Sequence, residues 1–201
     1  PLNLLVIMVE SLRADMLTSE IMPNTDRFAS NSFNFLQHYS GGNATRMGVF
    51  SMFYGLYGPY WFNFLDQQRG PVLLDVLIQQ NYQVGVYASQ KSSYPEFDKT
   101  VFVNFPPESL HENIQGKGYE RDEKTLGQLK DFLSAQKDGT PFFAYMFLES
   151  PHAPYTFPEE KALRKNYLTD LNYLKMRLDK DVDAILNRYI NACNYTDHLL
   201  G

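Results

Sequence analysis

The chain has 201 residues, with 23 acidic against 18 basic side chains and a formal net charge of −5 at neutral pH. A hydrophobic fraction of 44% and an aromatic fraction of 15% are ample for a packed core and exclude a disordered chain or a fibre. Net acidity without a cluster of Lys and Arg excludes the basic surface of a nucleic-acid-binding protein, so we expect no nucleic-acid partner. The longest apolar runs, Leu4–Val9 and Phe142–Leu148, are shorter than the roughly 20 residues that a membrane span requires.

The first part of the chain alternates between predicted strands and helices. Leu4–Val9 is a continuous β-prone run, typical of a strand that is covered on both faces. A helix is expected at 22–29, where an early proline suits a helix start, and a second strand at 33–39. After a glycine-rich loop, residues 45–54 are predicted to form a helix that Gly55 ends.

The same alternation continues to the end of the chain. Apolar residues recur at helical spacing in three segments, and β-prone runs lie between them. In chain order we predict a helix at 71–80, a strand at 83–88, a short strand at 101–105, a loop at 106–119, a helix at 120–136, a strand at 141–148 and a long helix at 179–200. Strands that alternate with helices predict an α/β fold, a three-layer sandwich with a mostly parallel sheet between helices. In such folds ligands bind beyond the carboxyl ends of the strands, which directs attention to the loops there.

Glu10 directly follows the first predicted strand. A carboxylate in that position is costly unless water, a partner or a cation compensates its charge, so Glu10 is a candidate metal ligand. The alternative is that Glu10 begins a helix, where it would interact favourably with the helix dipole. Its position alone leaves both interpretations open.

Thr45 stands where the segment GGNA enters a predicted helix. The start of a helix favours a phosphate or sulfate group, and a hydroxyl there could attack it if a cation lowered the hydroxyl pKa. The alternative is that Thr45, or Asn43 two residues earlier, only caps the helix, and Thr45 taken alone favours this interpretation.

His152 lies in the segment SPHAPY, just after the strand at 141–148, and the prolines beside it restrict its direction. It could donate to a substrate oxyanion or act as an acid. A lone loop histidine is more commonly an ordinary surface residue, as we expect for His38 and His111. The case for a site depends on Glu10, Thr45 and His152 together, because all three are expected at the ends of predicted strands, on one edge of one sheet.

Taken together, these segments resemble the amino-terminal part of the sulfatase-like domains of the alkaline phosphatase superfamily, over nearly the whole chain. Residues 4–15 resemble the first strand and acidic metal ligand of the phosphoethanolamine transferase branch, and MPNTDRFA at 22–29 is similar to a helix found throughout sulfatases. GNAT at 42–45 resembles the nucleophile loop, and residues 142–155 resemble the strand and loop that carry a substrate-binding histidine. The resemblance is strongest to the periplasmic domain of bacterial inner-membrane sulfatase-like proteins of lipid A and cardiolipin homeostasis.

Two departures from the family pattern affect the expected chemistry. Thr45 stands where true sulfatases have a Cys or Ser that matures to formylglycine, which threonine cannot form, so the resemblance favours phosphoester over sulfate-ester chemistry. The Asp-His-Gly motif that completes the family's metal site is absent, because Asp197-His198 ends a predicted helix and is followed by Leu199. We therefore expect 1–201 to be the amino-terminal portion of one such domain, with the carboxyl-terminal part missing.

The resemblance implies a metal-dependent phosphoester or sulfate-ester hydrolase or transferase with Thr45 as the nucleophile. Glu10 and Thr45 would be part of the ligand set of a divalent cation (Zn, Mn, Mg or Ca), and His152, Asn43 and Arg46 would bind the substrate. The expected substrate side is a phospholipid or lipopolysaccharide head group at the periplasmic face of the bacterial inner membrane, with attachment to the membrane through a segment outside this chain. Because the ligand set is incomplete, the chain alone is expected to be inactive.

Two other functions remain open at this point. The first is a catalytically inactive sulfatase-like domain with a lipid-binding or regulatory role, in which Glu10 and Thr45 are remnants. The second is a flavodoxin-like small-molecule-binding domain. It is disfavoured because its phosphate loop would follow the first strand, where this chain has Glu10-Ser11-Leu12.

Overall fold

Four parallel strands form the middle layer of the computed structural model, which describes residues 1–137, 139–177 and 179–201. From one edge of the sheet to the other they are β1 (Leu4–Val9), β4 (Phe142–Leu148), β2 (Gln83–Ala88) and β3 (Leu110–Glu112). Parallel neighbours need crossover connections, which are usually helices. The predicted parallel sheet is confirmed.

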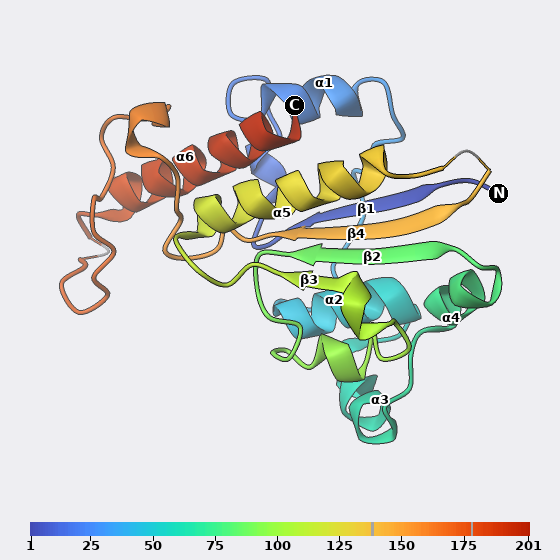
Figure 1. The fold of residues 1–201 in the computed structure, drawn as a ribbon. Helices are drawn as coiled ribbons and strands as arrows, with labels where there is room; N and C mark the ends of the chain where they lie inside the picture. The colour runs from blue at the N-terminus through green and yellow to red at the C-terminus, as the bar shows by residue number, and fades with distance from the viewer. Residues whose placement is uncertain (138, 178) are drawn as a thin grey trace.

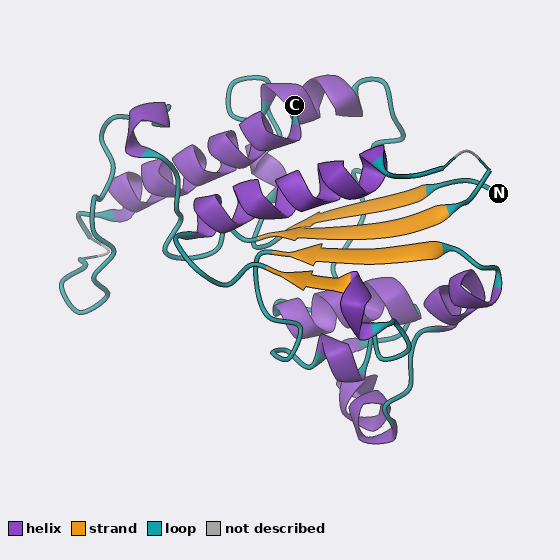
Figure 2. Cartoon of the chain, in the orientation of Figure 1, coloured by secondary structure: helices purple, strands orange, loops and turns teal. Residues whose placement is uncertain are grey.

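Helices cover both faces of this sheet, which gives the predicted three layers (Figures 1 and 2). One face carries α1 (Pro23–Ala29), α5 (Gly118–Ser134) and α6 (Val182–Leu200), and the other carries α2 (Thr45–Tyr54), α3 (Trp61–Gln67) and α4 (Val72–Gln79). Short 3-10 turns occur at Ala14–Met16, Gly58–Tyr60, Phe97–Lys99, Pro107–Ser109 and Glu159–Lys161. Within the described residues, none of the helices has both the length and the apolarity needed to cross a membrane.

The central strand β4 is apolar throughout because its two faces enter two different cores. Tyr145 and Phe147 pack into the core under α2, where the Phe53 ring meets the Tyr145 ring edge-on at 5.6 Å. Met146 and Leu148 face the opposite core, beneath α5. Burial on both faces explains why this segment lacks the alternation of a strand with one side in water.

The predicted strand at 33–39 is wrong. The segment forms turns and loop, and Phe33, Phe35, Leu36 and Tyr39 are between 79 and 94% exposed. Strand register is set by an apolar face that a second layer covers, and within the described residues no layer covers these side chains. The alternating apolar residues at 33–39 therefore have neither a partner strand nor a second layer to pack against among the described residues.

The predicted strand at 101–105 is also wrong, because this segment is a run of turns. Its buried side chains are Val101, Phe102 and Phe105, a spacing of one and three residues that suits a helical turn better than the period of two in a strand. The fourth strand is instead β3, which lies in the predicted loop at 106–119. Three residues paired with β2 are too few to leave a pattern in the sequence.

Asp197 joins α6 to the start of α1, which agrees with the prediction that Asp197-His198 is not a metal motif. Its carboxylate accepts hydrogen bonds from the backbone N–H groups of Asn24 (2.9 Å) and Thr25 (2.7 Å) and from the Thr25 hydroxyl (2.6 Å). No residue at the start of α1 caps that helix with its own side chain. The buried Asp197 therefore serves as its cap from a distant part of the chain.

Substitution of Asp197 by alanine is expected to lower the free energy of unfolding by about 3 kcal/mol, because it leaves three donors at the start of α1 without their charged acceptor. Urea unfolding followed by circular dichroism measures the change. Asp183→Ala, at an exposed position of the same helix, is the control and should cost less than about 0.5 kcal/mol. Equal costs for the two variants would contradict the capping role of Asp197.

Candidate functional site

Glu10 lies at the carboxyl end of β1, as predicted, and its backbone stays in register with β4. The Glu10 N–H donates to the carbonyl oxygen of Leu148 at 2.8 Å. A turn follows, in which Ser11 has a φ of +56°, and the next helical residues begin at Ala14. The alternative prediction, a helix that begins at Glu10, is therefore wrong.

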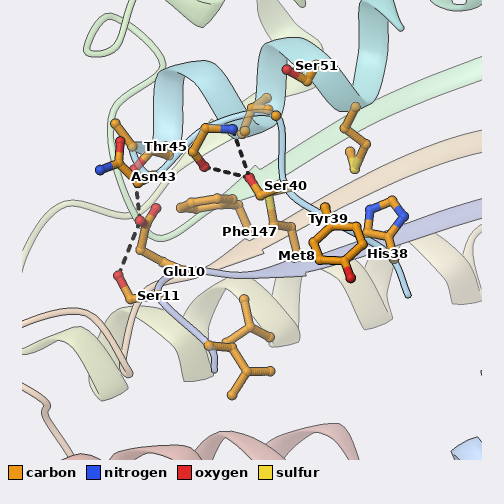
Figure 3. A pocket seen from close by; sticks show the side chains of 18 of the residues that line it. Met8, Glu10, Ser11, His38, Tyr39, Ser40, Asn43, Thr45, Ser51 and Phe147 are labelled. Carbon is orange, nitrogen blue, oxygen red and sulfur yellow. Dashed lines mark hydrogen bonds between the residues drawn. The ribbon is translucent and has the colours of Figure 1, made fainter. Parts of the chain in front are cut away.

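Thr45 is the first residue of α2, and its side chain points at Glu10 (Figure 3). The Thr45 Oγ1 hydroxyl donates to Glu10 Oε1 at 2.8 Å, across 35 positions of sequence. Ala44 is the N-cap residue of α2, and no side chain caps the helix there. The alternative prediction that Thr45 or Asn43 caps the helix is thus wrong.

The loop before Thr45 needs its two glycines because it lies directly against α2. A Cβ atom on Gly41 would lie 1.7 Å from Ser51 Oγ, and one on Gly42 would lie 2.5 Å from the Cβ of Met47. Ser40 fixes the loop from within, since its hydroxyl donates to the carbonyl oxygen of Gly42 at 2.6 Å. This close packing brings the loop and the start of α2 up to the end of β1.

A cleft of about 770 Å³ opens above these residues, between the end of β1, the loop at 38–44 and one side of α2. Figure 3 shows Glu10, Ser11 and Thr45 at one end of it and His38 and Tyr39 at the other. Asn43 lines the cleft together with several apolar side chains, including Met8, Leu12, Met52, Leu56, Tyr57 and Phe147. The sequence predicted His38 to be an ordinary surface residue, and the structure places it, exposed, in the cleft wall.

Arg46, a predicted substrate-binding residue, does not line this cleft in the part of the chain that the structure describes. Its guanidinium forms an ion pair with Glu96 at 2.7 Å. The same group lies over the rings of Trp61, at 5.6 Å from the centroid, and Tyr94, at 5.7 Å. These contacts hold Arg46 against the start of α3 and the loop that follows β2.

His152 lies in the loop after β4, at the same edge of the sheet as Glu10, but it is exposed and does not line the described cleft. Its backbone N–H donates to the carbonyl oxygen of Glu149 at 2.8 Å, and its Nδ1 lies 3.0 Å from the carbonyl oxygen of Ala153. The structure therefore brings Glu10, Thr45 and Asn43 together around one cleft, and places Arg46 and His152 outside its lining.

Glu149 is a neighbour of the site that the sequence analysis missed. It is the first residue after β4 and forms an ion pair with Arg121 at 2.9 Å. Burial raises the pKa of Glu149, the nearby Arg121 and His152 lower it, and the charges of Asp122 and Glu10 raise it further. Glu149 is thus within electrostatic reach of Glu10. An acidic residue directly after a strand, the signal that singled out Glu10, was also present here.

The two oxygens that meet at the end of β1 fit part of a divalent-cation site. Carboxylate and hydroxyl oxygens are ligands of the kind that Mg²⁺, Mn²⁺ and Ca²⁺ prefer, and Zn²⁺ also accepts carboxylates. Across the described ranges, however, no group of three or more His, Cys, Asp or Glu side chains is placed to hold an ion. Glu10 and Thr45 alone would therefore form only part of a cation site.

The family model described as "Sulfatase" matches residues 2–201. The chain belongs to the sulfatase family. The resemblance to the sulfatase-like domains is thereby confirmed.

Among curated proteins, this sulfatase-family chain is 34% identical over 146 residues to an uncharacterized protein of Haemophilus influenzae. The aligned region covers 73% of the chain and 24% of that protein. The chain is 27% identical over 192 residues to inner membrane protein YejM of Salmonella typhimurium, and this alignment covers 94% of the chain and 30% of YejM. The chain thus spans less than a third of the length of these relatives.

Solved structures show the same fold. The lipoteichoic acid synthase LtaP of Listeria monocytogenes superposes with a TM-score of 0.74 at 18% identity, over 99% of this chain and 50% of LtaP. A protein of the alkaline phosphatase superfamily from Vibrio parahaemolyticus superposes with a TM-score of 0.65 at 20% identity, over 98% of this chain and 48% of that protein. The sulfatase-like α/β fold that the sequence predicts is confirmed.

Proposed function

We propose that this chain is the amino-terminal, nucleophile-bearing portion of a divalent-cation-dependent phosphoester hydrolase or transferase, with Thr45 as the nucleophile. The observation that supports this most directly is the 2.8 Å hydrogen bond from Thr45 Oγ1 to Glu10 Oε1 at the end of an open cleft. A hydroxyl whose proton is already directed at a carboxylate has its lone pairs available to a group in the cleft.

Each residue at this end of the cleft has a distinct role in the proposed reaction. Thr45 Oγ1 forms a bond to phosphorus while the bond from phosphorus to the leaving alcohol breaks. The hydroxyl proton passes through the Glu10 contact to solvent, and the leaving alkoxide takes a proton from solvent. Asn43 and the backbone N–H groups at the start of α2 bind the phosphoryl oxygens. The oxygen of water or of an acceptor alcohol then forms a bond to phosphorus while the bond from phosphorus to Thr45 Oγ1 breaks; the incoming oxygen gives its proton to solvent, and Thr45 Oγ1 takes one back.

A bound divalent cation would lower the pKa of the Thr45 hydroxyl and offset the negative charge of the phosphoryl group. Glu10 and Thr45 are the residues of this chain that would hold it. Sulfate-ester hydrolysis is disfavoured because a threonine cannot supply the formylglycine of true sulfatases.

We further propose that the substrate is a phospholipid or lipopolysaccharide head group at the periplasmic face of the bacterial inner membrane. The apolar cleft wall formed by Tyr39, Met52, Leu56 and Tyr57 suits a molecule with an apolar part next to its phosphoester. The names of two related proteins, an inner membrane protein and a lipoteichoic acid synthase, are in keeping with an envelope role. Attachment to the membrane would come from a segment outside this chain.

The test is hydrolysis of a chromogenic phosphodiester and a chromogenic sulfate ester by the full-length protein. We expect cleavage of the phosphodiester, loss of activity after treatment with EDTA, recovery on addition of Mn²⁺ or Zn²⁺, and no cleavage of the sulfate ester. The 201-residue chain alone, assayed in parallel, is expected to be inactive because its ligand set is incomplete.

A full-length protein that remains inert with every divalent cation would overturn the catalytic proposal. The domain would then have the other role that its sequence allows, that of an inactive sulfatase-like domain that binds lipid or regulates another membrane protein. Binding of phospholipid vesicles by the inert protein would distinguish that role.

A further inference from the structure

The turn that presents Glu10 has an unusual backbone. Ser11, the next residue, has a φ of +56°, in the left-handed region that residues other than glycine rarely occupy. A conformation of this kind persists only where the surrounding structure holds it. Since Ser11 Oγ also lies 3.4 Å from Glu10 Oε1, the turn and the carboxylate are connected by backbone and side chain alike.

One side chain of α6 holds this turn from the opposite end of the sequence. The phenol of Tyr189 donates to the carbonyl oxygen of Ser11 at 2.7 Å and accepts from the backbone N–H of Arg13 at 2.8 Å. These two hydrogen bonds span 178 and 176 positions of sequence and join the Tyr189 hydroxyl to the backbone on both sides of the turn. Burial raises the pKa of Tyr189, so the phenol keeps the proton that it donates to Ser11.

Tyr189 itself is rigidly placed. Its side chain is buried in a small core with Met16, Met22 and Cys193, and its ring meets the Tyr155 ring edge-on at 5.4 Å. The same helix makes further contacts with the segment after β1, because Asn194 donates to the carbonyl oxygen of Ile21 and Asp197 caps α1. The phenol oxygen is the part of this helix that reaches the turn next to Glu10.

We propose that Tyr189 is a positioning residue that, through its hydroxyl, holds the Ser11 turn so that the Glu10 carboxylate faces Thr45 and the cleft. This inference rests on the proposed function, in which Glu10 is a cation ligand. Residues that orient a metal ligand without touching the metal commonly change its affinity by about 10- to 100-fold when they are removed.

The test compares two tyrosine-to-phenylalanine variants of the full-length protein. Tyr189→Phe keeps the packed ring and loses only the hydroxyl. Tyr195→Phe is the matched control, because Tyr195 is equally buried on the same helix but donates to Glu123, away from the turn. Isothermal titration with Mn²⁺, Zn²⁺, Mg²⁺ and Ca²⁺ measures cation affinity, Glu10→Gln serves as the reference for a lost ligand, and thermal unfolding measures stability.

The expected result is that Tyr189→Phe weakens cation binding by about 10-fold, whereas Tyr195→Phe leaves it unchanged, with similar melting temperatures for the two variants. Phosphodiesterase activity of Tyr189→Phe should recover at saturating cation, since Thr45 is intact. Unchanged affinity in Tyr189→Phe, or equal weakening in both variants, overturns the positioning role and leaves the proposed function standing. A wild-type protein that binds none of the four cations overturns both.

Discussion

Thr45→Ala is expected to reduce phosphodiester hydrolysis by the full-length protein by at least about 10⁴-fold, whereas Thr45→Ser should keep activity within about 10-fold of the wild type. Alanine removes the only atom of residue 45 that can form the covalent intermediate. Serine retains a hydroxyl that can make the same hydrogen bond to Glu10 Oε1. Steady-state hydrolysis of a chromogenic phosphodiester measures both effects.

The structure separates this loss of activity from a loss of folding. Ala44, and not Thr45, is the N-cap residue of α2, so alanine at position 45 leaves the start of the helix unchanged. The buried core residues of α2 are Val49, Phe50 and Phe53, and Thr45, which is only half-buried, is not among them. The melting temperature of Thr45→Ala should therefore stay close to that of the wild type.

Mass spectrometry gives a second readout of the same prediction. A phosphoryl adduct on the peptide that contains Thr45 should be trapped when the wild-type protein is quenched during turnover, and it should be absent from Thr45→Ala. Full activity in Thr45→Ala, or an adduct on another residue, would show that the nucleophile lies elsewhere.

The sequence predicted the fold well where an apolar pattern was continuous or where a residue such as glycine marked the end of an element. The helix at 45–54 and the strand at 4–9 were placed at their observed bounds, because a capping glycine ends one and a continuous apolar run defines the other. The expectation that this strand is covered on both faces is wrong, because β1 lies at one edge of the described sheet and its Leu5 and Ile7 are each 43% exposed. The segments at 33–39 and 101–105 failed for a different reason. Their apolar content is typical of strands, but whether such a segment finds a partner strand depends on the tertiary structure.

The candidate site, too, was predictable from the sequence only in part. Glu10 was found because parallel strands place their carboxyl ends at one edge of the sheet, whereas Thr45 follows no strand and meets Glu10 from the start of α2. Arg46 is next to Thr45 in sequence, but successive residues of a helix point about 100° apart, and its side chain turns to Glu96 and Trp61 instead. Contacts such as that of Tyr189 with Ser11 leave no sequence signal, since their partners lie more than 170 positions apart.

Asp122 is expected to be the most sensitive position for stability in the neighbourhood of the site. This carboxylate of α5 is fully buried and accepts hydrogen bonds from the backbone N–H groups of Glu149 (2.8 Å) and Ser150 (2.9 Å) and from the Ser150 hydroxyl. Asp122→Ala leaves the two buried donors of Ser150 and the half-buried N–H of Glu149 without an acceptor, and we expect the free energy of unfolding to fall by about 4 kcal/mol. Asp131→Ala, at an exposed position of the same helix, should change it by less than about 0.5 kcal/mol.

The pH dependence of that loss of stability tests whether burial or hydrogen bonding determines the protonation state of Asp122. Burial raises the pKa of Asp122 above its unfolded value of 3.8, although its hydrogen bonds with Ser150 and Ser89 and with the backbone act in the opposite direction. Between the two pKa values the folded state binds more protons than the unfolded state, so the contribution of Asp122 to stability is fully present below pH 3.8 and is lost as pH rises through the folded pKa. Urea unfolding should therefore show a larger difference between wild type and Asp122→Ala at about pH 3.5 than at about pH 7. A smaller difference at the lower pH would mean that the hydrogen bonds outweigh burial and that Asp122 is held as a carboxylate, fixing the loop after β4 by charge.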